Sequence, residues 1–350
     1  MREGLLEHFT EQAAFCEAYG SPFTARLIEA MAADLVAGGP VAALVAEWPG
    51  PPRADAVSLR LAGALHTAAL TGRSAALAAA YPAARPDWRM EDVLPAARAF
   101  LATERDWVAA FIRSAPQTNE TRRSIALLAG FLEIAKTFDL PMDTLEVGAS
   151  AGLNLSWDRF SYQTDAWTWG EAAGVAIDTA WRGAPPALDA KPQVRTRAAC
   201  DLNPLDIRDP DARMRLRSYV WADQTDRLKR FDAAVELALA NDVRVERASA
   251  DDWLERKLAA RAGDAVTVVY HSVFLQYPPR EVQARIADVI RKAGEKRQAP
   301  LVWLRMEPEA LLGGPRESND FLVDITSWPG GERRILAKTD GHVRSVESLL

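Results

Sequence analysis

The chain has 350 residues, of which 49% are hydrophobic and 26% are charged. This length suffices for one large domain or two ordinary ones, and the composition is that of a globular protein. The formal net charge of −6 argues against a protein that coats nucleic acid, because phosphate binding needs clustered Lys and Arg.

Cysteine and histidine usage predicts no protein-built metal site. Cys16 and Cys200 are far apart, and neither they nor the four His show metal-ligand spacing. Acids stand where a signal peptide would be apolar, and no apolar run approaches the length of a membrane span. We therefore expect a cytoplasmic protein with no membrane or nucleic-acid partner; the oligomeric state stays open.

Residues 1–140 are predicted to be helical. Leu5, Phe9, Ala13 and Cys16 recur at helical spacing, and no segment of this region has the pattern of a strand. The region is therefore predicted to form a helical domain or cap. Its further helices are expected at Phe23–Ala37, Leu59–Ala80 and Leu94–Ser114.

A polar loop, Pro116–Ser124, leads into the next predicted helix. Thr118 or Asn119 can cap that helix, and a cap alone would explain them. Alternatively, the helix borders a ligand site before the first strand. Gln117, Asn119 and Arg123 would then face the ligand.

The segment Asp143–Asp158 combines a buried strand, Thr144–Val147, with a small-residue turn and the start of a helix. The turn contains Gly148, Ser150 and Gly152. Small residues let the backbone approach a ligand closely, and a helix N-terminus offers N–H groups to it. This arrangement is typical of a nucleotide-binding unit.

The spacing Glu146-x-Gly148-x-Ser150-x-Gly152 resembles the first motif of class I S-adenosylmethionine (SAM) methyltransferases. That motif is an acid followed by spaced glycines, and Ser150 replaces the middle one here. An acid before the turn suits a cationic amino group or a hydroxyl better than a phosphate. The resemblance implies that these four residues contact SAM.

A wider similarity covers nearly the whole chain. Gly148–Leu155, with Gln117–Glu120 upstream and Val220-Trp221 downstream, is similar to an uncharacterised bacterial family, domain of unknown function number 2332. That family has no established activity, so the similarity supports the fold more than the function.

The same turn is also a literal G-x-S-x-G, the nucleophile elbow of α/β-hydrolases. Ser150 would be the nucleophile, with His271 or His342 downstream in the order of that triad. A hydrolase elbow needs several strands and an oxyanion loop before it, and residues 1–140 supply neither. It would also leave Glu146 and Asp201 without a role.

Aromatic residues alternate after the turn, which predicts an inserted β-hairpin near 160–192. Gln193–Cys200 is predicted as the second strand. In the methyltransferase resemblance, Asp201 at its tip binds ribose hydroxyls. Asp201 lies about 50 residues beyond Gly148, where about 20 are expected, so Asp165 remains the alternative acid.

Strands and helices continue to alternate toward the C-terminus. Val243–Glu246 is predicted as the third strand, and Asp251 or Asp252 would then either bind adenine, as the resemblance implies, or cap a helix. Ala265–Tyr270 is a β-branched run suited to the centre of a parallel sheet. His271 at its end either accepts a proton or holds the strand end.

The remaining segments are predicted to complete the sheet. Pro210–Ala240 is expected to form one helix or two, Leu301–Pro308 the fifth strand, and Phe321–Trp328 with Arg333–Lys338 a terminal antiparallel pair. Three further residues are candidates for a substrate pocket: Trp221, Tyr277 and Arg305.

We therefore predict a helical region at 1–140 and, at 141–350, a doubly wound, mostly parallel α/β domain of the Rossmann-like class I methyltransferase type. The protein is expected to bind SAM and transfer its methyl group to a small molecule, with His271 taking the proton. A non-catalytic nucleoside-binding protein is the alternative, which Ser150 in place of glycine leaves open.

Overall fold

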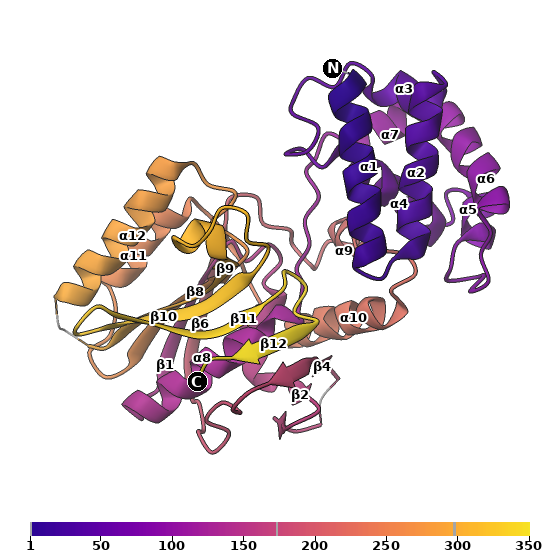
Figure 1. Cartoon of the computed structure of the whole chain (residues 1–350). Helices are drawn as coiled ribbons and strands as arrows, with labels where there is room; N and C mark the ends of the chain where they lie inside the picture. Colours follow the sequence, from indigo (N-terminus) through magenta and orange to yellow (C-terminus); the bar gives the residue numbers. More distant parts are fainter. Residues whose placement is uncertain (1, 173, 297–298) are drawn as a thin grey trace. The chain divides into compact units, whose positions relative to one another are not determined.

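The computed structural model describes residues 2–172, 174–296 and 299–350. The chain divides into a helical unit, Met1–Thr118 with Arg208–Asp232, and a sheet unit, Asn119–Ile207 with Ala233–Leu350 (Figure 1). This division differs from the predicted boundary at residue 140. Helix α8 (Arg123–Phe138) packs on the sheet, and the segment after residue 207 packs on the N-terminal helices.

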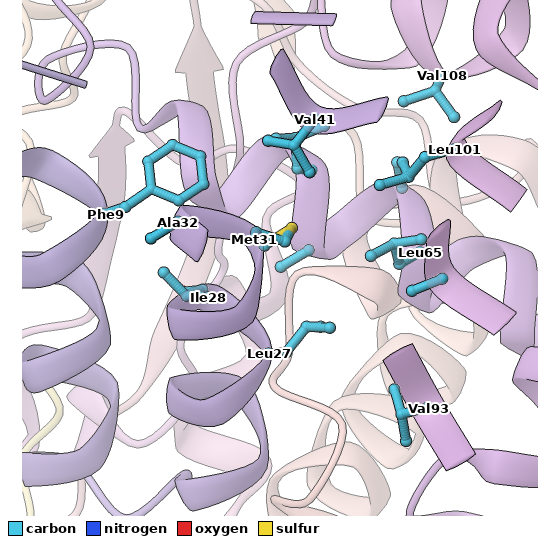
Figure 2. Close-up of a cluster of buried hydrophobic side chains, with 14 of the residues drawn as sticks. Phe9, Leu27, Ile28, Met31, Ala32, Val41, Leu65, Val93, Leu101 and Val108 are labelled. Atoms are coloured by element: carbon cyan, nitrogen blue, oxygen red, sulfur yellow. The ribbon is translucent and has the colours of Figure 1, made fainter. Parts of the chain in front are cut away.

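The helical unit is built from amphipathic helices that share one core. The predicted face of the first helix is fully buried, with Leu5, Phe9 and Cys16 at 0% exposure. Figure 2 shows Phe9, Ile28, Met31 and Leu65 in this core. The helices are α1 (Arg2–Ala18), α2 (Pro22–Val36), α3 (Pro40–Val45), α4 (Val57–Leu70), α5 (Ala75–Ala80), α6 (Met90–Thr103), α7 (Arg105–Phe111) and α9 (Pro210–Ser218).

Two segments that were predicted as single helices are each divided. After α4 the chain turns at Gly72, whose φ is +69°, and the Ser74 side chain accepts a hydrogen bond from Leu77 N as the cap of α5. Helices α6 and α7 meet at Glu104, whose dihedral angles are not helical. The apolar periodicity continues across both breaks, which is why the sequence pattern did not separate these helices.

The described part of the sheet unit contains a nine-stranded sheet in the order β5-β12-β11-β10-β9-β8-β1-β6-β7. The five neighbouring strands β9, β8, β1, β6 and β7 are parallel to one another. Strands β10 and β11 are antiparallel to their neighbours. The bounds are β1 (Met142–Val147), β5 (Ala180–Arg182), β6 (Val194–Asp201), β7 (Glu246–Arg247), β8 (Val266–Ser272), β9 (Leu301–Pro308), β10 (Phe321–Trp328), β11 (Glu332–Thr339) and β12 (Ser345–Ser348).

Helices cover both faces of this sheet (Figure 1). Gly130 of α8 contacts Leu304 of β9 on one face. On the other face, Trp253 of α11 (Ala250–Ala259) and Ile286 of α12 (Arg280–Glu295) share a core with Trp303 of β9. The chain is thus a mixed α/β protein with a large, mostly parallel sheet, as the alternation of strands and helices predicted.

The strand order reverses between β1 and β8. From β1 the chain first proceeds outward to β6 and β7 and then returns to β8 and β9 on the other side. Ligands of doubly wound sheets bind outside the carboxyl ends of the strands at such a reversal. The segment after β1 is therefore the place where a binding site is expected.

The predicted insert forms a second, three-stranded sheet within the described residues. Strands β2 (Ser161–Gln163) and β3 (Thr168–Trp169) are antiparallel, and β4 (Ala176–Asp178) pairs parallel to β2. The turn after β1 leads into η1 (Leu153–Arg159), a 3-10 helix with a kink at Ser156. The remaining elements are α10 (Thr225–Ala240) and η2 (Glu309–Leu312).

Of the helices in the described ranges, none combines the length and apolar character that a membrane crossing requires.

The close approach of α8 to the sheet predicts an unusual response to alanine. A Cβ at Gly130 would lie 2.3 Å from Leu304 Cδ1, and Leu304 is fully buried. Overpacking of ~1–3 kcal/mol should exceed the helix-propensity gain of ~1 kcal/mol, so we expect Gly130→Ala to lower the free energy of unfolding in urea. Gly4→Ala in α1 is the control and should not destabilise, because the described residues outside the helix's own backbone leave open space around the new Cβ. Equal stabilisation by both changes would contradict this packing.

Candidate functional site

The turn after β1 uses small residues because its backbone is left-handed at three positions. The φ angles of Gly148, Ser150 and Gly152 are +68°, +55° and +75°. Glycine adopts this region without a steric penalty, whereas Ser150 adopts it at a cost of roughly 1 kcal/mol or more. The path of the chain thus explains the two glycines, whereas Ser150 occupies its position at an energetic cost.

The N–H groups of the turn bind atoms of the protein itself. Ser150 N donates to Asp201 Oδ2 at 2.8 Å, and Ala149 N donates to the carbonyl of Cys200 at 3.1 Å. The carbonyl of Ala149 accepts from Gly152 N at 2.8 Å. Asn119 Oδ1 accepts from both Ala151 N (3.2 Å) and Leu153 N (3.0 Å).

Asn119 is therefore the residue of the Gln117–Glu120 segment that reaches the turn. Its amide oxygen caps the first turn of η1, in place of the predicted cap of α8. In return, Asn154 Nδ2 of η1 donates to the carbonyl of Glu120 at 3.3 Å. Two of the three segments that carry the wider similarity, Gln117–Glu120 and Gly148–Leu155, thus bind each other.

Asp201 lies where the second strand ends, as predicted. Besides Ser150 N, its carboxylate accepts from Asn203 N, at 2.8 Å to Oδ1. A carboxylate has about four acceptor positions, and Asp201 is partly exposed, so it retains capacity for ligand hydroxyls. The alternative acid, Asp165, lies in the insert and accepts from Trp181 N at 2.8 Å.

Glu146 is buried at the end of β1, with 4% exposure. Tyr270 of β8, its partner in the sheet register, donates its hydroxyl to Glu146 Oε2 at 3.1 Å. Burial, together with the nearby Asp201 charge, raises the pKa of Glu146 to about 8 although the Tyr270 hydrogen bond opposes this rise. A carboxyl that stays largely protonated near neutral pH thus lies directly before the turn.

Tyr270 is a site residue that the sequence analysis missed. Its hydroxyl binds Glu146, and its ring makes an edge contact with Phe131 of α8, at 5.2 Å between centroids. The alternation of β8 was the available signal, because Tyr270 precedes His271 and must face the opposite side of the sheet.

His271 does not have the surroundings of a proton acceptor. The side chain is fully buried, and Nδ1 lies 2.6 Å from Oε1 of the equally buried Glu307. Trp303 Nε1 donates to Nε2 at 3.0 Å. An indole N–H can only donate, so Nε2 accepts and Nδ1 carries the proton. Both ring nitrogens are used inside the protein, which supports the alternative that His271 holds the strand end.

The same contacts oppose the hydrolase interpretation. A triad would need Nε2 of a histidine to accept the proton of Ser150, but in His271 this atom accepts from Trp303. His342 lies in the last turn of the chain, where its amide donates to Asp340 Oδ1 at 2.8 Å. The contacts of His271 therefore do not support its pairing with Ser150.

The loop after β8 covers one side of the turn. The ring of Phe274 lies over Gly148, where a Cβ would come within 2.3 Å of Phe274 Cδ2. Glu307 fixes the loop by accepting from Phe274 N at 2.7 Å and Leu275 N at 3.2 Å. Phe274 could not be predicted from the sequence, since a single aromatic residue in a loop carries no pattern.

The two acids that were candidates for adenine binding form ion pairs with a residue of α12. Arg285 of α12 donates to Asp251 Oδ2 at 2.9 Å and to Asp252 Oδ1 at 2.7 Å. Asp251 also accepts from the hydroxyl of Ser249, the residue before α11. These contacts join α11 to α12 and supply no specific support for adenine binding.

The remaining candidates have varied surroundings. Arg305 forms a bidentate ion pair with buried Asp324, at 2.7 and 2.8 Å. Arg123 donates to the carbonyl of Gly341, and Tyr277 is 74% exposed. Gln117 and Trp221 belong to the helical unit, where Trp221 is 8% exposed within the core.

Among the residues that the structure describes, no three His, Cys, Asp or Glu side chains are grouped so as to hold a metal ion. Cys16 and Cys200 are both buried, and burial raises the thiol pKa of each to about 12.

The fold and the turn define an α/β protein with a doubly wound sheet and a self-bonded glycine turn at the reversal of strand order. The chain belongs to DUF2332, a family of uncharacterised proteins conserved in bacteria, which it matches over residues 6–348. Searches of curated proteins and of solved structures gave no match.

Glu307 is expected to be a stabilising residue. Glu307→Ala leaves the His271 ring and the amides of Phe274 and Leu275 without their buried acceptor, so the free energy of unfolding should fall by about 3 kcal/mol. The exposed Glu347, changed to alanine, is the control and should alter stability by less than about 0.5 kcal/mol. A loss below about 1 kcal/mol for Glu307→Ala would contradict the buried network.

The raised pKa of Glu146 predicts a pH-dependent stability. Between the ordinary glutamate pKa and about 8, the unfolded chain loses this proton and the folded chain keeps it, so stability falls as pH rises. Glu146→Gln removes this dependence. We measure the free energy of unfolding in urea for the variant and for the wild type. The value for the variant minus the value for the wild type should therefore increase from pH 5 to pH 8, by up to ~1.4 kcal/mol per pH unit. If the difference in unfolding free energy between Glu146→Gln and the wild type does not change with pH, Glu146 is ionised over this whole range.

Proposed function

We propose that the protein binds SAM at the carboxyl ends of β6, β1 and β8 and transfers the methyl group to a small molecule. The observation that carries this proposal is the arrangement around the turn. Three left-handed residues follow the strand at the reversal of order, and the acids Glu146 and Asp201 end the two adjacent strands.

The roles of these groups follow from their chemistry. Asp201 retains acceptor positions for the two ribose hydroxyls, which a carboxylate can bind together. A cationic amino group of the ligand beside Glu146 would favour the ionised carboxylate and so lower the raised pKa of this residue. Phe274 lies over Gly148 and supplies an apolar surface beside the turn.

The parallel part of the sheet supports this class of fold. Its strands follow the order third, second, first, fourth and fifth, which is the doubly wound arrangement of nucleotide-binding sheets. The C-terminal strands β10, β11 and β12 then run as an antiparallel meander. We therefore base the assignment on the first five strands and the turn.

Methyl transfer in this proposal depends on placement. The sulfonium already activates the methyl carbon, so the protein has to hold a nucleophile in line with it. His271 is not assigned to proton removal, because its ring nitrogens are bound to Glu307 and Trp303.

A non-catalytic nucleoside-binding protein is the second candidate. It is favoured by the same engagement of His271, which leaves no histidine base at the end of β8. SAM that binds and yields no S-adenosylhomocysteine with a pool of small-molecule nucleophiles would favour this candidate over the methyltransferase.

Calorimetric titration of the full chain with SAM tests the proposal. We expect binding, and we expect Asp201→Asn to weaken it at least about tenfold, a loss of ~1.4 kcal/mol, because one acceptor and the charge are removed. Asp165→Asn is the matched control, since Asp165 binds Trp181 N in the insert, and it should leave the affinity unchanged.

No heat of binding with the folded wild-type chain would refute the proposal. A loss confined to Asp165→Asn would move the ribose site to the insert. Circular dichroism of each variant establishes that a change in affinity is not a change in folding.

A further inference from the structure

The turn after β1 has the form of an anion site that the protein fills by itself. Consecutive N–H groups in alternating backbone conformations form a concavity that binds phosphates in other folds. Here the five amides from 149 to 153 already donate to the protein. Two of the acceptors are side chains, Asp201 and Asn119.

We propose that this turn selects nucleosides that carry no phosphate, and that Asn119 and Asp201 set the selectivity by occupying the amides that a phosphate would need. The inference rests on the proposed function, because it concerns the ligand of the same site. It excludes a class of ligands, the nucleoside diphosphates and dinucleotides, that other doubly wound sheets bind at this position.

Displacement of either side chain would leave buried or charged groups without partners. Asn119 Oδ1 accepts from two amides, and Asp201 accepts from Ser150 N and Asn203 N. A phosphate that took these amides would leave the Asp201 carboxylate beside a second negative charge, and like charges at close range disfavour each other.

One basic side chain does lie near Asp201. Arg247 at the end of β7 donates from Nη1 to Asn203 Oδ1 at 3.1 Å and to the carbonyl of Leu202 at 3.3 Å. These contacts hold the loop that follows β6. The guanidinium therefore supports the loop that follows Asp201, and the amides of the turn keep their own acceptors.

Asn119 is the more informative of the two residues for a test. Asn119→Ala releases the amides of Ala151 and Leu153, which are then available to an anion. Asn119→Asp keeps an acceptor oxygen at the same place and adds a negative charge. The two changes should have opposite effects on a phosphate-bearing ligand.

The test is calorimetry of the full chain with SAM, adenosine, ADP and NAD. We expect SAM and adenosine to bind, and ADP and NAD to bind at least about 100-fold more weakly than adenosine. In Asn119→Ala the ratio of the Kd of ADP or NAD to the Kd of adenosine should decrease by about tenfold or more. In Asn119→Asp this ratio should not decrease. Asn241→Ala is the control, because that amide donates to Leu237 O within α10, and it should keep the wild-type ratio.

The possible results separate this inference from the proposed function. If SAM binds and ADP binds as tightly as adenosine, the selectivity is refuted and SAM binding stands. If neither SAM nor adenosine binds, the proposed function fails, and the inference fails with it. If Asn119→Ala does not fold, the ligand series on the wild-type chain and on Asn119→Asp still decides.

Discussion

The need to satisfy the amides of the turn at 148–153 determines how the parts of the sheet unit meet. A buried N–H group without an acceptor costs about as much as a lost hydrogen bond, and the left-handed turn has too few internal partners. Asn119, which precedes α8, and Asp201, which ends β6, supply the acceptors. These contacts join the ends of α8, β1 and β6, and they leave a carboxylate at the surface of the site.

The alternation of β8 gives the two faces of the sheet different chemistry at this end. Tyr270 faces α8 and binds Glu146, whose carboxyl lies beside the turn and is kept largely protonated by burial. His271, the next residue, faces the opposite side and is held by Glu307 and Trp303. On the first face, the Glu146 carboxyl thus lies beside the turn that we propose to bind a ligand. The second face fixes the loop that carries Phe274 over Gly148.

Much of the fold could be predicted because its signals are local. The β-branched run of β8 and the apolar periodicity of α1 identified these elements, and the small-residue turn marked the strand before it. The partners of His271 could not be predicted, since Trp303 and Glu307 become its neighbours only through the register of β8 with β9. For the same reason Asp251 looked available for a ligand, whereas Arg285 of a later helix binds it. Asn119 was a candidate for a helix cap or a ligand contact, and in the structure its side-chain oxygen accepts from two amides of the turn.

Hydrogen exchange of the full chain with and without SAM tests the central claim most directly. The account predicts that SAM slows amide exchange in peptides that cover Glu146–Leu155 and Cys200–Asn203, because the ligand would cover the turn and the end of β6. Exchange in the peptide that contains Asp165 should not change. Protection by SAM that is confined to segments outside the turn, or no protection at a saturating concentration, would contradict the account.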